Sequence, residues 1–245
     1  MASSTRPSNK RASAKRASAK RASAKRAAKP AAAASAPSFV LHGRRGRRHT
    51  SENVSSVSST RQTAKTVPGI ERADGAEIAA ILQRRLVAYV DLSLTLKHVH
   101  WNVVGPAFIG VHEMLDPQYA AVQLMVDGTA ERIATLGSSP NGLPGSVAST
   151  RGWDDYELGR ADVQSHLAAL DLVYDGVIES ARGELDQLEE LDAITHDMVV
   201  AQIAQLEQFQ WFVRAHLEDA AGGTVAMGEK TELGAATKAA RAARR

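Results

Sequence analysis

Apolar residues recur at helical spacing through four long stretches of this chain, and no other feature limits its fold so strongly. This spacing gathers the apolar side chains on one face of a helix, and that face must be buried against another element. The Val-Val pairs at 103–104 and 199–200 are too short to be convincing strands. The sequence therefore predicts an all-α protein. The helices are expected at about residues 76–101, 110–136, 161–188 and 192–220.

The connections indicate how these helices pair. Gly105 and Pro106 break the chain between the first two helices, so a short turn joins them into an antiparallel hairpin. Gly137 is expected to end the second helix as a left-handed C-cap. Residues 137–152 are rich in Gly, Pro and Ser and form a long connection with room for a short helix. Two hairpins joined by one long crossover make a four-helix bundle of the ferritin-like kind.

Two pairs of potential metal ligands lie in the second predicted helix. His112 and Asp116 are four residues apart, as are Asp127 and Glu131, so each pair projects from one face of the helix. His100 lies at the end of the first helix, near the first pair. Two imidazoles and three carboxylates form a nitrogen and oxygen set that suits iron, manganese or zinc.

The spacing between the two pairs indicates a shared site. Asp127 follows Asp116 by eleven residues, which is roughly 16 Å along a straight helix that rises about 1.5 Å per residue. Ligands of one ion must lie within about 2.0–2.2 Å of it, so one helix cannot supply both pairs, whereas a second copy lying antiparallel across a two-fold axis can. We therefore predict that His100, His112 and Asp116 come from one chain. Asp127 and Glu131 come from its partner.

Taken one at a time, these residues fit simpler roles. A histidine at a helix end is usually a cap or a surface residue, and single acids on a helix are usually solvated. The joint spacing favours the metal site. The run from His112 to Asp116 superficially resembles the zincin motif H-E-x-x-H, but Asp replaces the second His, so a protease is not expected. Pro117 removes a backbone N–H directly after Asp116 and predicts a kink beside the site.

Charge divides the chain. Residues 1–66 hold 16 Lys and Arg against one acidic residue, a net charge of +15, whereas residues 67–245 carry a net charge of −12. We expect a disordered basic tail and linker over residues 1–66, a folded acidic domain over 67–220, and a flexible Ala-rich basic tail over 221–245. The absence of cysteine excludes disulfides and thiolate metal sites and suits a reducing compartment.

The basic tail is predicted to bind DNA without sequence preference, because each cation that neutralises a phosphate releases counterions. Its Lys-Arg pairs repeat every five residues, a step that turns a helix by about 140° and spreads the cations around it, so a membrane-bound amphipathic helix is not expected. A solubilising extension and a transit peptide are the alternatives. The predicted DNA-binding residues are Lys10, Arg11, Lys15, Arg16, Lys20, Arg21, Lys25, Arg26, Arg44, Arg45, Arg47 and Arg48.

Three runs in the folded domain resemble the signatures of the Dps family, the DNA-binding proteins from starved cells. Residues 91–106 read DLSLTLKHVHWNVVGP, residues 108–116 read FIGVHEMLD, and residues 127–137 read DGTAERIATLG. Together these runs are specific, and the resemblance covers about residues 70–220. It implies a hollow dodecamer of four-helix subunits, with ferroxidase centres at the two-fold interfaces.

The resemblance also implies a function. The five predicted ligands match those of the family's centre, where two irons bind between subunits and are oxidised, preferably by hydrogen peroxide. It implies mineral storage in the cavity and DNA protection in the cytoplasm, at the nucleoid and away from membranes. Trp101 matches an aromatic residue beside the centre, where it would take up stray oxidising equivalents; a packed core tryptophan is the alternative. Two other functions stay open: a nucleoid-packing protein with a structural metal site, and an iron store whose tail has another partner.

Overall fold

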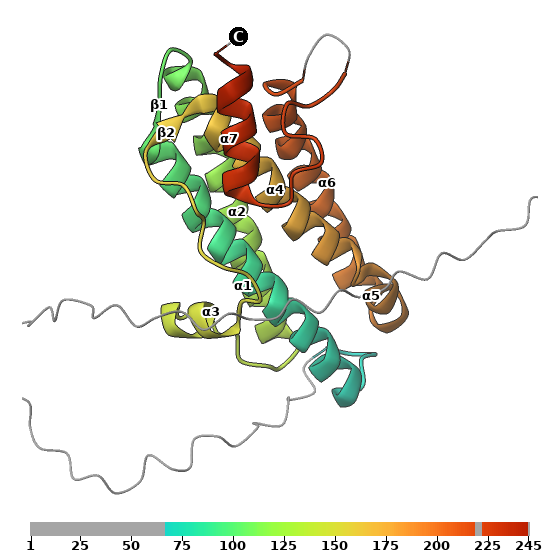
Figure 1. Ribbon diagram of the computed structural model, residues 1–245. Coiled ribbons are helices and arrows are strands. Elements are labelled where there is room, and N and C mark those ends of the chain that lie inside the picture. Colours follow the sequence, from blue (N-terminus) through green and yellow to red (C-terminus); the bar gives the residue numbers. More distant parts are fainter. Residues whose placement is uncertain (1–66, 219–221, 245) are drawn as a thin grey trace, which may run out of the picture. The chain divides into compact units, whose positions relative to one another are not determined.

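The computed structural model describes residues 67–218 and 222–244, and its long helices confirm the all-α, ferritin-like bundle (Figure 1). Helices α1 and α2 form the first hairpin and helices α4 and α6 the second, with their apolar faces buried between them. None of the described helices is both long enough and apolar enough to cross a membrane. The basic segment 1–66, with every predicted DNA-binding residue, lies outside the described residues. The bounds are Arg72–Asn102 for α1, Phe108–Thr135 for α2, Val163–Arg182 for α4 and Ala193–Ala215 for α6.

Helix α2 is continuous and ends near the predicted residue. Pro117 lies inside the helix, which runs through the proline without a break. Gly137 follows the helix with a φ of 85°, a left-handed conformation that glycine adopts at little cost. The N–H of Ser138 donates to the carbonyl of Ile133 at 3.1 Å, which closes the helix in the manner of a Schellman motif. The helix therefore extends unbroken from the predicted histidine site to this cap.

The third predicted helix consists of two helices. Helix α4 ends at Arg182, and α5 spans Leu185–Leu191. Gly183 separates them, but the apolar spacing continues across this point, so periodicity alone merges the two helices. Helix α6 begins directly after Asp192, whose side chain accepts a hydrogen bond from the N–H of Thr195 at 3.0 Å as an N-cap.

The crossover from α2 to α4 contains one expected and one unexpected element. The short helix α3 spans Pro144–Thr150, within the connection predicted to have room for it. The expectation that Val103–Val104 is too short for a strand is wrong, because this pair forms β1. It pairs in parallel with β2 at Ala161–Asp162, where the third helix was expected to begin. A two-residue strand has no periodicity, and its partner is distant in the sequence, so pattern analysis does not detect it. This pairing holds the crossover beside the end of α1.

The centre of the bundle contains apolar side chains with a few hydroxyls and amides. The hydroxyl of Tyr89 donates to Gln202 Oε1 at 3.2 Å, and Gln202 Nε2 donates to Thr129 Oγ1 at 3.3 Å. The hydroxyl of Tyr174 donates to Gln118 Oε1 at 2.7 Å. These polar groups of the described interior are neutral, unlike the inward Glu-x-x-His sets of bundles that bind two irons within one chain.

Within residues 221–245, expected to be a flexible tail, residues 232–242 form a packed helix instead. Helix α7, Glu232–Ala242, packs against α4 through Ala235, Ala236 and Ala239. Small side chains allow two helices to approach closely. A short Ala-rich segment has no large apolar residue that would indicate burial in the sequence, which explains why the helix was not predicted there.

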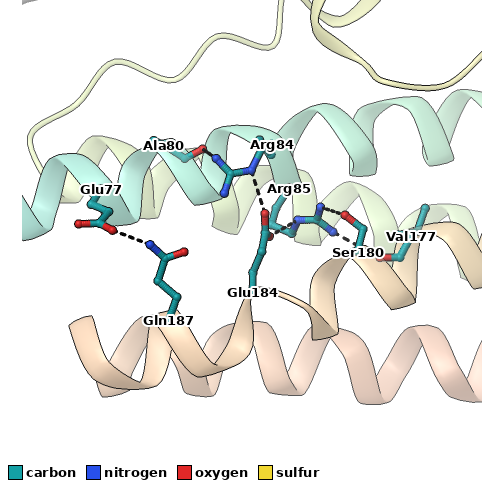
Figure 2. Close-up of polar contacts among 8 residues, drawn as sticks. All are labelled: Glu77, Ala80, Arg84, Arg85, Val177, Ser180, Glu184 and Gln187. Carbon is teal, nitrogen blue, oxygen red and sulfur yellow. Dashed lines mark hydrogen bonds and ion pairs between the residues drawn. The ribbon is translucent and has the colours of Figure 1, made fainter. Parts of the chain in front are cut away.

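A buried arginine links α1 to the start of α5 (Figure 2). Arg85 is only 2% exposed, and its Nε lies 2.7 Å from Glu184 Oε2. Its Nη1 donates to the carbonyl of Val177 at 3.3 Å, and its Nη2 donates to the hydroxyl of Ser180. Glu184 also accepts a hydrogen bond from Nε of Arg84 at 2.9 Å, nearer the surface. The carboxylate therefore neutralises a charge that the bundle has removed from water.

Removing this carboxylate should destabilise the bundle. In Glu184→Gln, Arg85 keeps its charge and loses its counter-ion, and we expect the free energy of unfolding to fall by about 3 kcal/mol. Arg84→Gln is the matched control, because its exposed pair with the same carboxylate contributes about 0–1 kcal/mol. Urea unfolding followed by circular dichroism at equal protein concentrations measures both changes. Equal losses in the two variants would contradict the importance of the buried charge.

Candidate metal centre

The turn between α1 and α2 brings two predicted ligands into contact. His100 lies in the last turn of α1, and His112 lies near the start of α2. Gly105 has a φ of 112°, a backbone conformation that other residues rarely adopt, and so allows the chain to reverse tightly. The two imidazole rings stack with their centroids 3.6 Å apart and their planes at 24°. The structure thus places the two histidines side by side at one end of the first hairpin.

Reciprocal hydrogen bonds hold both rings in one tautomer. Nδ1 of His100 lies 3.0 Å from the carbonyl oxygen of His112, and Nδ1 of His112 lies 3.0 Å from the carbonyl oxygen of His100. A carbonyl oxygen only accepts hydrogen bonds, so Nδ1 carries the proton in each ring. The lone pair of each neutral imidazole is then on Nε2, the nitrogen that remains available to a metal ion.

Asp116 lies beside this pair and is bound to a lysine that the sequence analysis missed. Its Oδ1 is 3.4 Å from His100 Nδ1 and accepts a hydrogen bond from Lys97 Nζ at 2.6 Å. The hydrogen bond from Lys97 lowers the pKa of the exposed Asp116 carboxyl below its usual value. Lys97 Nζ also lies 4.9 Å from the ring centroid of Tyr119, a cation–π contact. Because Lys97 precedes His100 by three residues, helical spacing is the signal that would have identified it.

Asp127 and Glu131 are not brought to this cluster within one chain. Both are exposed on α2, and the unbroken helix carries Asp127 roughly 16 Å beyond Asp116 at its usual rise. Among the residues that the structure describes, no group of three or more His, Asp or Glu is arranged to hold a metal ion. One chain therefore presents the predicted ligands as two separate parts, and even the histidine part, His100, His112 and Asp116, is not arranged as a metal site by itself. The exposed acidic part is accessible to a second chain.

Aromatic residues lie close to the histidine pair in the sequence and in the fold. The ring of Phe108 is 4.9 Å from that of His112, centroid to centroid. Trp101 follows His100 directly and is 72% exposed, so the alternative of a core tryptophan packed within its own chain is wrong. His98 belongs to other surroundings, since its Nε2 lies 2.7 Å from the carbonyl oxygen of Leu158 in the crossover.

The histidine part of the site suits a divalent transition metal. Two imidazole nitrogens and one carboxylate oxygen are ligands that iron, manganese and zinc all accept. The backbone carbonyls orient the rings before a metal arrives, which reduces the ordering that binding requires. The Lys97 ammonium group binds Oδ1 of Asp116, so an incoming cation competes with it for this carboxylate.

Comparisons with known proteins cover the whole bundle. A family profile described as a ferritin-like domain matches residues 79–222, a range that contains all five predicted ligands. The chain is 56% identical over 176 residues to the DNA protection during starvation protein of Mycolicibacterium smegmatis, covering 72% of this chain and 96% of that one. The solved structure of Mycobacterium smegmatis Dps matches with a TM-score of 0.68 and 55% identity, over 69% of this chain and 97% of that chain. DpsA14 from Streptomyces coelicolor matches with a TM-score of 0.66 and 53% identity, over 66% and 97%.

Replacing Lys97 should strengthen metal binding. Lys97→Met keeps a long side chain without charge, so a metal no longer competes with an ammonium group for Asp116. We expect the dissociation constant for Co(II) in the assembled protein to fall a few-fold, as measured by calorimetric titration at neutral pH. Lys230→Met, at an exposed position before α7, is the control and should change nothing. Weaker Co(II) binding in Lys97→Met would show instead that the lysine positions Asp116 for the metal.

Proposed function

Because this chain belongs to the Dps family of ferritin-like proteins, we propose that it is a ferroxidase, an oxidoreductase acting on metal ions, that stores iron and protects DNA. Members of this family are ferroxidases in general. The observation that carries the proposal is the stacked pair of His100 and His112, whose Nδ1 atoms are hydrogen-bonded to backbone carbonyls, so that the Nε2 lone pairs are left for a metal. The Asp116 carboxylate lies 3.4 Å from Nδ1 of His100. Iron is the substrate and the cargo of this site.

The proposed site is completed by two chains across a two-fold axis, within a dodecamer of the kind that the family resemblance implies. His100, His112 and Asp116 of one chain bind together with Asp127 and Glu131 of the other, and two irons occupy each site. Support comes from the exposure of Asp127 and Glu131. It comes also from α2, whose unbroken length keeps these acids away from the histidines of their own chain.

In the proposed reaction, each of two Fe(II) ions gives one electron to one molecule of hydrogen peroxide. The O–O bond breaks, two hydroxides form, and the irons leave as Fe(III). Because a fully loaded site supplies both electrons together, no hydroxyl radical is released. The chain contributes oriented Nε2 atoms and the Asp116 carboxylate, whose pKa is lowered by the hydrogen bond from Lys97. Carboxylates of the acidic domain would attract Fe(II) to the shell and favour growth of the ferric mineral inside it.

The proposed interaction with DNA is electrostatic. The domain over residues 67–245 carries a net charge of −12 and should repel a duplex, so the net charge of +15 on residues 1–66 must supply the attraction. Several tails on one assembly would make this attraction multivalent. The protein would then protect DNA both by removing iron with peroxide and by coating the duplex, as a component of the nucleoid.

A complementation experiment tests the shared site. One variant carries His100→Gln with His112→Gln, and a second carries Asp127→Asn with Glu131→Gln. Each alone should oxidise Fe(II) with peroxide at least about 10-fold more slowly, since changes in residues that only orient metal ligands already cost about 10–100-fold. Co-expressed, the two variants should recover activity, because every mixed two-fold interface contains one intact site.

The absorbance of the ferric product measures this recovery. His216→Gln is the control, because this histidine is exposed at the end of α6, and it should keep the full rate. A mixed assembly without recovered activity would contradict the intersubunit site. Unimpaired oxidation by the double histidine variant would show that His100 and His112 do not carry the ferroxidase activity, and would favour a structural role for any metal that they bind.

Deleting residues 1–66 should abolish DNA binding and leave Fe(II) oxidation unchanged. A matched variant keeps the length of the tail and replaces the Lys-Arg pairs of its five-residue repeat by Gln, which separates charge from length. Neither variant should retard duplex DNA in a gel. Binding by the unaltered chain should weaken steeply as the salt concentration rises, because binding releases counterions. Equal retardation by the truncated chain would show that DNA binds elsewhere.

A further inference from the structure

Behind the end of α1 that carries His100, a tyrosine from the crossover lies between two other histidines. The Tyr156 hydroxyl is 3.0 Å from Nδ1 of His166 on α4 and also lies 3.3 Å from the backbone carbonyl oxygen of His166, a second acceptor. The two rings are parallel within 9°, with centroids 6.0 Å apart. On the other side, the Tyr156 ring meets the ring of His98 edge to face at 5.7 Å. The proposed metal centre does not use this cluster of His98, Tyr156 and His166.

His166 places a neutral imidazole beside the Tyr156 hydroxyl. Its side chain is fully buried at 0% exposure, and this burial lowers the pKa of His166, so the ring is neutral near pH 7. Within the described residues, its Nε2 atom has no hydrogen-bond partner. The backbone carbonyls of Asn102 and Gly159 lie near the ring and favour its protonated form. In the tautomer that carries its proton on Nε2, the Nδ1 lone pair faces the Tyr156 hydroxyl.

Tyr156 differs in this respect from the other tyrosines. The chain has four tyrosines, and the structure describes all of them. Tyr89 and Tyr174 donate to glutamine amide oxygens, which do not take up a proton near neutral pH. Tyr119 faces an ammonium group, which disfavours removal of an electron from its ring. A phenol that loses an electron must also lose its proton, and only Tyr156 has a neutral base within transfer distance.

The last turn of α1 connects this cluster to the proposed metal centre. His98 and His100 are two residues apart in one helix and therefore project toward different sides. Asn102 Nδ2 donates a hydrogen bond to the carbonyl oxygen of His98 at 2.8 Å, which stabilises the same turn. One turn of helix thus carries a proposed metal ligand on one side and the contact with Tyr156 on the other.

We propose that Tyr156 is a redox-active residue that gives up one electron while its phenolic proton moves to Nδ1 of His166. The inference rests on the proposed ferroxidase function, which supplies the oxidant. It applies to a site that holds one Fe(II): this ion reduces hydrogen peroxide by one electron, and Fe(III), hydroxide and a hydroxyl radical result. An electron from Tyr156 then reduces the radical to hydroxide, leaving a neutral tyrosyl radical and a protonated His166.

A second Fe(II) closes the cycle. It gives one electron to the tyrosyl radical and becomes Fe(III), and the proton returns from His166 to the tyrosine oxygen. Over the cycle, two Fe(II) and one peroxide give two Fe(III) and two hydroxides, as in a fully loaded site. Tyr156 and His166 therefore allow a half-filled site to complete the reduction of peroxide without releasing the radical.

Rapid-freeze electron paramagnetic resonance tests this proposal. The assembled protein is loaded without oxygen with one Fe(II) per site and mixed with hydrogen peroxide, and the oxidised iron is measured in the same samples. We expect a tyrosyl signal that narrows when the chain contains ring-deuterated tyrosine. Tyr156→Phe, which keeps the ring and removes the hydroxyl, should lose this signal, as should His166→Gln. Tyr174→Phe is the matched control for a buried tyrosine and should keep it.

The outcomes separate this proposal from the function on which it rests. Iron oxidation without a tyrosyl signal, or with a signal unchanged by Tyr156→Phe, would overturn the proposal and leave the ferroxidase function intact. Absence of peroxide-dependent iron oxidation in the unaltered chain would overturn both. If Tyr156→Phe fails to assemble, a deuterium-sensitive tyrosyl signal that is lost in His166→Gln supports the proposal. A signal that His166→Gln leaves unchanged overturns it.

The number of Fe(II) ions loaded per site distinguishes a redox role of Tyr156 from a structural one. At two Fe(II) per site, Tyr156→Phe should oxidise iron at the unaltered rate, and a slower rate would indicate a structural role and overturn the proposal. At one Fe(II) per site, the same variant should show more oxidation of the exposed side chains of Trp101 and Met227, detected by mass spectrometry.

Discussion

The reciprocal hydrogen bonds between His100 and His112 are the interaction on which the proposed chemistry depends. Each ring donates a hydrogen bond from Nδ1 to the backbone carbonyl oxygen of the other residue. The same two bonds therefore set the tautomer of the rings and the distance between the helices. They form because the reversal at Gly105 is tight and because the apolar faces of α1 and α2 are buried together. Loss of packing in this hairpin would therefore disturb both the position and the proton of each candidate ligand.

The bundle was predictable from sequence because its four long helices have wide apolar faces, which repeat with the helical period. The features that escaped prediction depend on contacts between distant residues. The separation of α4 from α5 follows Gly183 and is stabilised by the ion pair between Arg85 and Glu184, while the apolar pattern continues through it. The pairing of β1 with β2 and the alanine contacts of α7 with α4 likewise have no periodic signal.

For the candidate site, residue type and spacing single out five predicted ligands, and their binding of a metal stays a prediction. The structure brings His100 and His112 together and keeps the Asp127 and Glu131 pair apart from the histidines of the same chain. Spacing does not reveal hydrogen bonds, so the tautomer of the histidines could be learned only from coordinates. Lys97 escaped notice for a different reason, because a lysine on an amphipathic helix is usually a solvated charge.

The ion pair between Lys97 and Asp116 has a consequence for a subunit that has just been synthesised. Until a partner supplies its acidic residues, the lone subunit offers iron two imidazoles and a carboxylate already occupied by its own cation. Under the proposed function, we expect such a subunit to hold iron weakly and therefore to start little radical chemistry on its own. In the proposed scheme Lys97 lowers the affinity of the lone subunit for iron. Oxidation begins only after assembly, when the acidic residues of a partner raise that affinity.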